Sequence, residues 1–257
     1  MSQVVPIADS HRKCQGCAGD GLDFDFTMAF QPIVDVSTRT IFAHEALVRG
    51  LNGESAASVL SLVTAENRYS FDQACRVKAI EWAARLQIPA KLSINFLPNA
   101  VYEPAACIRL TLATAEKCGF PVERIMFEVT EDEQSKDLGH LKKIYDDYKL
   151  RGFTTAIDDF GSGYAGLGML AAFLPDIIKV DMGLIRGIDR DAVKRTIVKG
   201  LLLIASELGV RVIAEGVETV EEYRVLMGMG VVLYQGFLFA RPAVEAQGVV
   251  DWSCCGI

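Results

Sequence analysis

Short apolar runs alternate with amphipathic helical patterns over most of this chain, and their spacing limits the possible folds. Six runs begin at residues 91, 124, 154, 177, 211 and 233, so successive starts lie 33, 30, 23, 34 and 22 residues apart. A strand, a crossover helix and the next parallel strand take about 30 residues together. The spacing therefore predicts parallel strands joined by helices, with strands over residues 91–96, 124–129, 154–157, 177–180, 211–214 and 233–239.

Two further β-rich runs, residues 28–36 and 41–48, precede this repeat. The connection between them is too short for a parallel crossover, so we expect an antiparallel hairpin. Eight strands in a chain of 257 residues predict an α/β fold, a (β/α)8 barrel of the TIM type with one antiparallel strand. An open, doubly wound sheet is the alternative that periodicity leaves open. Helical patterns cover residues 55–64, 71–86, 103–118, 138–150, 192–208 and 220–229.

Composition and charge exclude several classes of protein. Half of the residues are hydrophobic (51%) and 23% are charged, which is too apolar for a disordered chain. No run reaches the roughly 18 apolar residues of a membrane helix, so we expect no membrane insertion. The net charge of −7 disfavours binding to duplex nucleic acid. We expect one barrel domain over residues 26–257 and an N-terminal tail or cap over residues 1–25.

The cysteines and the N-terminus indicate a cytoplasmic protein. Seven cysteines are an odd number, which favours reduced thiols over a disulfide framework. The first residues carry no secretory signal pattern. A zinc clip is a minor alternative to free thiols if the two ends of the chain meet; its ligands would be Cys14, Cys17, Cys254 and Cys255.

Polar side chains interrupt or follow nearly every predicted strand. The C-terminal ends of barrel strands converge on one face, so we expect these side chains to share one mouth. A single carboxylate at a strand end is often a helix cap or a solvated loop residue. Several carboxylates buried together repel one another and cost several kcal/mol unless cations compensate them. The residues concerned are Glu45, Asn95, Glu128, Asp158, Asp159, Lys179, Glu215 and Gln235.

The donor types at these positions favour Mg²⁺ or Mn²⁺ over zinc. The chain holds three histidines, and only His44 adjoins one of the strand-end residues. Because neighbouring side chains of a strand point to opposite faces, His44 points outward if Glu45 points inward. Oxygen ligands are typical of Mg²⁺ and Mn²⁺. They suffice for two cations roughly 3.5–4 Å apart, an arrangement that activates water against a phosphodiester.

The glycines between Gly161 and Gly166 also match a dinucleotide-binding pattern, with the acidic Asp181 following at a suitable distance. Two observations argue against that function. Asp158 and Asp159 directly precede the glycines and would repel a pyrophosphate, and the motif lies in the middle of the chain instead of in the first strand–helix–strand unit. We therefore do not expect a nicotinamide cofactor.

Eight short motifs between Met28 and Pro242 resemble the EAL domain family of cyclic di-GMP phosphodiesterases, in the family's order. They include Glu45-Ala46-Leu47, Asp158-Asp159-Phe160-Gly161 and Gln235-Gly236. The resemblance implies a stand-alone EAL domain that uses Mg²⁺ or Mn²⁺ to hydrolyse cyclic di-GMP to linear 5′-pGpG. A catalytically silent cyclic di-GMP receptor, or a protein-interaction module, is the alternative function.

The resemblance also implies residue roles. Glu45, Asn95, Glu128 and Asp158 would bind one cation, and Asp158 with Asp159 would bridge to a second. Lys179 and Glu215 would flank the attacking water; Glu215 would be a ligand, a base or both, and the sequence leaves open which of the two residues accepts the proton. Arg49 would bind phosphate because a guanidinium offers a bidentate fork.

Further roles follow from the same resemblance. Gln31 and Leu47 would hold a guanine or the adjoining phosphate, and Gln235 would lie near the waters. Glu131 would tether the loop from Phe160 to Gly166, and the family forms homodimers through that loop and the helix after it. Asp181 and Glu218 would support the site from its surroundings.

Overall fold

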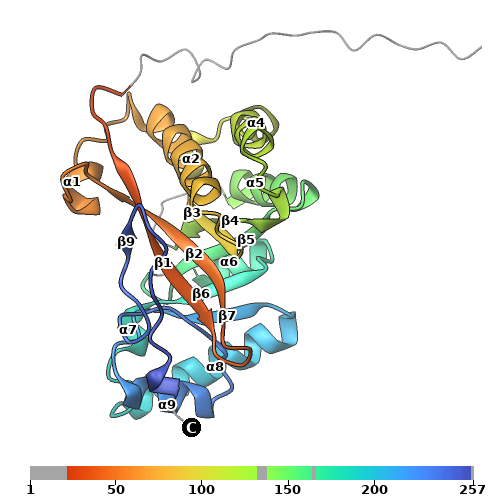
Figure 1. Ribbon diagram of the computed structural model, residues 1–257. Helices are drawn as coiled ribbons and strands as arrows, with labels where there is room; N and C mark the ends of the chain where they lie inside the picture. Colours follow the sequence, from red (N-terminus) through yellow and green to blue (C-terminus); the bar gives the residue numbers. More distant parts are fainter. Residues whose placement is uncertain (1–21, 132–137, 164–165, 256–257) are drawn as a thin grey trace, which may run out of the picture.

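The computed structural model describes residues 22–131, 138–163 and 166–255 (Figure 1). Within them the strands pair in a closed ring, which confirms the barrel and excludes the open sheet. Strand β1 (Thr27–Asp35) runs antiparallel to β2 (Thr40–Arg49) and to β8 (Leu233–Tyr234), while the remaining ring strands pair in parallel. Those strands are β3 (Lys91–Asn95), β4 (Ile125–Thr130), β5 (Thr154–Phe160), β6 (Ile177–Val180) and β7 (Arg211–Ala214).

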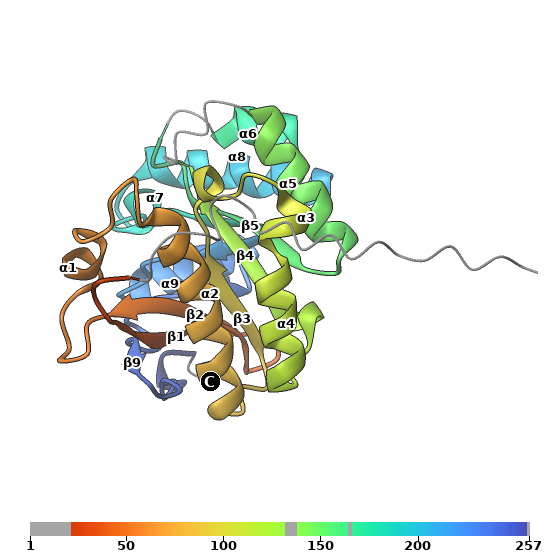
Figure 2. The same ribbon diagram turned by 90° about the horizontal axis from the view of Figure 1, so that it is seen from above.

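Helices form the outer layer around this barrel (Figure 2). Most lie between consecutive strands, as the sequence predicts. Their bounds are α1 (Ala56–Leu60), α2 (Arg68–Arg85), α3 (Pro104–Cys107), α4 (Arg109–Cys118), α5 (Leu138–Leu150), α6 (Gly166–Ala172), α7 (Met182–Ile185), α8 (Ala192–Leu208) and α9 (Val220–Gly228). No helix in the described ranges is long and apolar enough to cross a membrane.

One apolar side chain from each of seven strands fills the barrel interior. Each of these residues is at most 1% exposed, and together they form a separate core cluster. We call this apolar layer the floor of the barrel, because a site at the barrel mouth lies directly above it. Its members are Ile33, Ala43, Met126, Ala156, Ile177, Ile213 and Leu233.

Two predicted elements differ from the structure, and one observed strand was not predicted. The helical pattern over residues 103–118 is divided into α3 and α4 at Ile108. The strand predicted over residues 233–239 ends at Tyr234, because the chain turns at Gly236 against the backbone of Val217. A Cβ at Gly236 would lie 2.0 Å from the Val217 carbonyl oxygen. A short strand that the sequence did not predict, β9 (Ala243–Val244), then pairs with β1.

Candidate active site

Seven of the predicted site residues form the next layer above the apolar side chains that fill the barrel. In a strand, residues two apart point to the same side. Each inward polar residue accordingly stands two positions from a floor residue, as Glu45 does from Ala43 and Glu128 from Met126. The same step generates Asp158, Lys179, Glu215, Gln235 and, on the antiparallel strand, Gln31. The two-residue period of the strands therefore explains why these side chains all point into one mouth of the barrel.

Lys179 lies at the centre of this layer with its side chain 1% exposed. Its Nζ contacts four carboxylates from four strands or strand ends. The distances are 2.7 Å to Glu215 Oε1, 2.9 Å to Asp158 Oδ1, 3.0 Å to Glu128 Oε2 and 3.5 Å to Glu45 Oε2. With Asp159, five carboxylates therefore share the mouth with one ammonium group.

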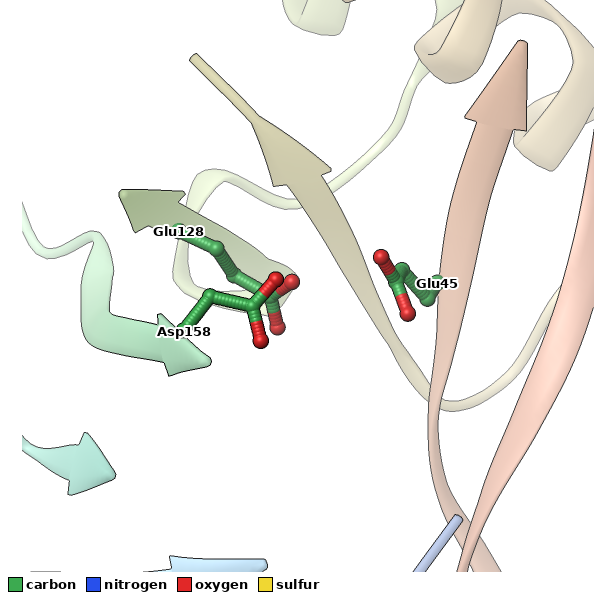
Figure 3. Close-up of side chains that lie close together, drawn as sticks. All are labelled: Glu45, Glu128 and Asp158. Atoms are coloured by element: carbon green, nitrogen blue, oxygen red, sulfur yellow. The ribbon is translucent and has the colours of Figure 1, made fainter. Parts of the chain in front are cut away.

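Two groups of three carboxylates could each hold a metal ion. Glu45, Glu128 and Asp158 offer oxygens within 4.8 Å of one another, and so do Asp158, Asp159 and Glu215. Figure 3 shows the first group, with the carboxylates of Glu128 and Asp158 close together and that of Glu45 facing them. Asp158 belongs to both groups, which is the arrangement needed for a bridging ligand between two cations.

The pKa values at the mouth reflect this crowding. Burial raises the pKa of Glu128 to about 8, against the effect of Lys179. Burial and then the charge of Asp158 raise the pKa of Asp159 to about 6, and burial raises that of Glu215 well above its usual range. Burial lowers the pKa of Lys179, but the four carboxylates outweigh it and hold that pKa well above normal. One ammonium is therefore too little compensation for the carboxylates.

Two amide side chains orient the carboxylate of Glu45 by donating hydrogen bonds to its two oxygens. Asn95 Nδ2 donates to Glu45 Oε1 at 2.9 Å, and Gln235 Nε2 donates to Glu45 Oε2 at 2.6 Å. Gln235 Nε2 also lies 3.2 Å from Gln31 Oε1, and Gln31 donates to the Ala240 carbonyl at 3.2 Å. The structure thus brings Gln31, Asn95 and Gln235 to the carboxylate cluster.

Glu131 holds the glycine-rich segment after β5. Its Oε2 accepts from the Gly161 N–H and its Oε1 from the Gly166 N–H, both at 2.6 Å. These amides, which a dinucleotide site would offer to a pyrophosphate, are already bound to Glu131. Two residues of the segment, 164 and 165, lie outside the described residues.

A cleft of about 250 Å³ opens beside the cluster. Asp181 and Glu218 line it, and Asp181 caps α7 by accepting from the Gly183 N–H at 2.8 Å. Arg186, which pairs with Glu218, and Phe237 also line this cleft. The sequence analysis missed both. Arg186 ends a single-turn helix and Phe237 follows the early end of β8, so no periodic pattern marked either position.

Arg49 and Leu47 share the inward face of β2 with Glu45, since they lie at two-residue steps. Leu47 lines a second, apolar cavity of about 260 Å³ that also touches Asn95. Arg49 lies outside the lining of both cavities, and its Nη1 donates to the Val48 carbonyl at 2.7 Å. His44 is fully buried, and neither nitrogen of its ring has a hydrogen-bond partner within the described ranges.

Two of the four proposed zinc ligands, Cys254 and Cys255, are free thiols whose Sγ atoms lie 3.8 Å apart. Cys14 and Cys17, the other proposed zinc ligands, lie outside the described residues.

The family model described as "EAL domain" matches residues 22–242. The chain belongs to the EAL domain family. A stand-alone versatile EAL protein from Vibrio cholerae O395, solved with c-di-GMP bound, is 55% identical with a TM-score of 0.89, over 92% of this chain and 100% of that one. Klebsiella pneumoniae BlrP1, solved with manganese and c-di-GMP, is 34% identical with a TM-score of 0.82, over 91% of this chain and 59% of that one.

Two curated EAL relatives carry informative descriptions. The blue light- and temperature-regulated antirepressor BluF of Escherichia coli K12 is 30% identical over 248 residues, which cover 96% of this chain and 61% of BluF. The cyclic di-GMP phosphodiesterase PA2567 of Pseudomonas aeruginosa is 27% identical over 241 residues, which cover 90% of this chain and 40% of PA2567. This EAL domain thus spans about two fifths to three fifths of the length of these two relatives.

Proposed function

We propose that this EAL domain hydrolyses cyclic di-GMP to linear 5′-pGpG with two divalent cations, Mg²⁺ or Mn²⁺. The observation that carries the proposal is that two groups of three carboxylates at one barrel mouth share Asp158. The phosphodiesterase description of PA2567 and the manganese and c-di-GMP in the BlrP1 structure support it.

The residues at the mouth fit divalent cations. Glu128 Oε1 is buried and has no hydrogen-bond partner among the described residues, although a buried carboxylate oxygen needs one. Both carboxylate groups contain oxygen donors alone, which suits hard cations. Glu45, Asn95, Glu128 and Asp158 would hold one cation, and Asp158, Asp159 and Glu215 the other. Bound there, such cations lower the pKa of a water molecule and stabilise charge on a phosphoryl group.

Lys179 and Glu215 are the residues proposed to manage the proton of the attacking water. Lys179 Nζ lies 2.9 Å from Oδ1 of Asp158, the shared ligand, and 2.7 Å from Glu215 Oε1, so it contacts both carboxylates. Lys179 orients the carboxylates, and either group is within reach of a water at the cluster. The variants Lys179→Met and Glu215→Gln distinguish them: the residue whose loss removes the acidic limb of the pH–rate profile is the one that accepts that proton.

Substrate contacts are proposed for residues around the two cavities. Gln31 and Gln235 line the cleft and would bind a phosphate or a guanine, and Leu47, which lines the apolar cavity, would pack against a base or ribose. Arg49, on the same face of β2, would release the Val48 carbonyl to bind a phosphate. Arg186 adds a second guanidinium at the cleft.

The decisive experiment is incubation of the purified protein with cyclic di-GMP and Mn²⁺, followed by chromatography of the products. We expect 5′-pGpG from the parent protein and from the control variant Glu116→Ala, which alters an exposed residue of α4. Glu45→Ala should lose activity by at least 100-fold, because it removes a ligand of the first carboxylate group. No product from the parent protein, or equal turnover by Glu45→Ala, would refute the proposal.

A silent receptor is the second candidate, and two observations favour it. Lys179 compensates part of the carboxylate charge, so the chain supplies one cationic group of its own at the mouth. A BlrP1 structure, 30% identical with a TM-score of 0.75, is described as holding cyclic diGMP and no metal ions. Tight binding of cyclic di-GMP with Mn²⁺ present, and no product over hours, would favour the receptor over the hydrolase.

We also propose that the protein forms a homodimer through the segment from Phe160 to Gly166 and α6. Leu167 on α6 and Leu174 just after it are exposed at 59% and 44%, which is costly for large apolar side chains unless something covers them. Leu167→Glu should shift sedimentation toward the monomer, whereas Leu150→Glu at the end of α5 should not. A parent protein that sediments as a monomer at micromolar concentration would refute the dimer.

The proposed setting of this reaction is the cytoplasm, with no role in binding duplex nucleic acid. Free thiols at every described cysteine support a reducing compartment. The net charge of −7 opposes contact with a phosphate backbone. Activity recovered with the membrane or periplasmic fraction of cells would contradict this placement.

A further inference from the structure

A fully buried ion pair lies on α2, behind the strand ends that carry two of the proposed ligands. Arg76 is 0% and Asp72 2% exposed, and Arg76 Nη2 lies 2.8 Å from Asp72 Oδ2. Burying such a pair costs desolvation energy that an apolar pair of similar volume would avoid, so it is weak evidence for stability. The pair therefore calls for another explanation.

Arg76 contacts the residues next to the ligands. Its guanidinium carbon lies 5.6 Å from the ring centroid of Phe96 and 5.0 Å from that of Phe127. Phe96 directly follows Asn95, and Phe127 directly precedes Glu128. Neighbouring residues of a strand point to opposite sides, so Arg76 braces the outer face of β3 and β4 where their inner face presents Asn95 and Glu128. Arg76 Nη1 also donates a hydrogen bond to the hydroxyl oxygen of Tyr148 on α5, at 2.8 Å.

Asp72 contacts the backbone beyond Asn95. Its Oδ1 accepts a hydrogen bond from the Leu97 N–H at 2.9 Å. The preceding amide, Phe96 N–H, makes the last ladder bond of β3, to the Glu128 carbonyl at 3.0 Å. Leu97 has therefore left the sheet, and Asp72 supplies the acceptor that the next strand no longer provides. An apolar residue at position 72 would leave this amide without that acceptor.

We propose that Asp72 and Arg76 are positioning residues for the metal site: together they fix the end of β3 and so the amide oxygen of Asn95. Arg76 holds the Asp72 carboxylate in place, and Asp72 accepts the hydrogen bond of the Leu97 amide. Together with the bond from the Phe96 amide, this bond fixes the backbone conformation directly after Asn95. Asn95 then presents its side chain beside Glu45, to which it donates at 2.9 Å. The inference rests on the proposed function, since it assigns the pair a role toward that metal site.

The test compares three double variants with the parent protein. Asp72→Leu with Arg76→Met removes the pair and the acceptor for Leu97, whereas Asp72→Asn with Arg76→Met removes the pair and restores an acceptor oxygen. Asp147→Leu with Arg151→Met is the matched control, because Asp147 on α5 and Arg151 just after α5 form a pair at the same spacing, and both are partly exposed. Each protein is unfolded in urea, and its Mn²⁺ affinity is measured by calorimetry without substrate.

We expect Asp72→Leu with Arg76→Met to bind Mn²⁺ at least about tenfold more weakly, the size of effect typical of residues that orient metal ligands. The asparagine double variant should recover part of this affinity, because it restores the acceptor for the Leu97 amide but lacks the Arg76 contact that holds residue 72, and the control should be unchanged. The cooperative unfolding of the leucine variant should persist, since its new side chains are apolar in an apolar surrounding. A folded leucine variant with parental Mn²⁺ affinity would overturn the inference, and so would failure of asparagine to restore part of it.

Amide hydrogen exchange provides a measurement that does not depend on the variants folding. In the parent protein, slow exchange at Leu97 supports the proposal, and exchange as fast as in an exposed loop overturns it. A parent protein that binds Mn²⁺ but does not cleave cyclic di-GMP would refute the hydrolase and leave the inference standing. A parent protein that binds no Mn²⁺ would overturn both.

Discussion

Lys179 places an ammonium group at the centre of a carboxylate cluster. This position predicts that the stability lost on replacing Lys179 depends on whether metal is present. Lys179→Met leaves four carboxylates without their shared partner. Removing one partner of a buried ion pair typically costs about 3–5 kcal/mol of stability, because the other charge stays buried without compensation. We expect a loss of this order in EDTA and a smaller one in millimolar Mn²⁺, where the cations compensate the carboxylates. Urea unfolding in the two solutions measures both values.

The control for this prediction is Lys142→Met. Lys142 pairs with Asp146 at 2.6 Å on α5, and both side chains are more than half exposed, so its loss should change stability by less than about 1 kcal/mol in either solution. Equal stability of Lys179→Met and the parent protein in EDTA would mean that the carboxylates do not depend on the ammonium.

His44 shows the opposite situation, a buried polar group without a partner. Its ring is 0% exposed, neither nitrogen makes a hydrogen bond among the described residues, and burial lowers its pKa to about 4. Replacing such a group by an apolar one removes a desolvation penalty of about 1–3 kcal/mol. His44→Leu should therefore raise the midpoint of urea unfolding at pH 7.

His140 serves as the matched histidine for this prediction. Its Nε2 lies 2.6 Å from the Val101 carbonyl oxygen, so His140→Leu removes a hydrogen bond and should lower the same midpoint. A lower midpoint for His44→Leu would show that the ring of His44 contributes more by packing than its buried nitrogens cost.

At the scale of elements, the segment after β5 depends on one carboxylate. Both oxygens of Glu131 accept backbone amides, from Gly161 and from Gly166. Glu131→Gln keeps one acceptor and turns the other into a donor that faces an N–H group. Because the segment adjoins Asp159, we expect the Mn²⁺ concentration for half-maximal turnover to rise about tenfold. Glu123→Gln, in the short 3-10 helix before β4, should leave this concentration unchanged. The same value for both variants would contradict the prediction.

The sequence predicted the elements well where a repeating pattern governs them. Seven of the eight ring strands appear close to their predicted bounds, because each carries an apolar run set by burial in the barrel. The eighth, β8, was predicted too long because residues 236–239 remain apolar after the chain has turned. Gly236 allows that turn through a backbone contact with Val217, which lies in a distant loop, so the local pattern could not reveal it.

At the scale of the whole molecule, the site was predictable to the extent that the barrel determines it. Closure brings the strand ends together, and the two-residue period selects the side chains that point inward. The central place of Lys179 among four carboxylates was not predictable, because it depends on side-chain length and on the ring order of the strands. Arg186 and Phe237 reach the cleft from irregular connections, which carry no period at all.

The charge of the whole chain adds to that of the mouth and predicts metal-dependent substrate binding. The net charge is −7, and one ammonium group cannot offset the carboxylates of the cluster, so a dianionic nucleotide is repelled until cations bind. We expect calorimetry to give a Kd for cyclic di-GMP at least tenfold higher in EDTA than in Ca²⁺, a hard cation that also takes oxygen ligands. KCl at the ionic strength of the Ca²⁺ solution separates screening from coordination: it should restore only a small part of the affinity, since screening acts on distant charges more than on buried ligands. Full affinity in EDTA with KCl would mean that the substrate is held by the cleft alone, and that the cations serve only the chemical step.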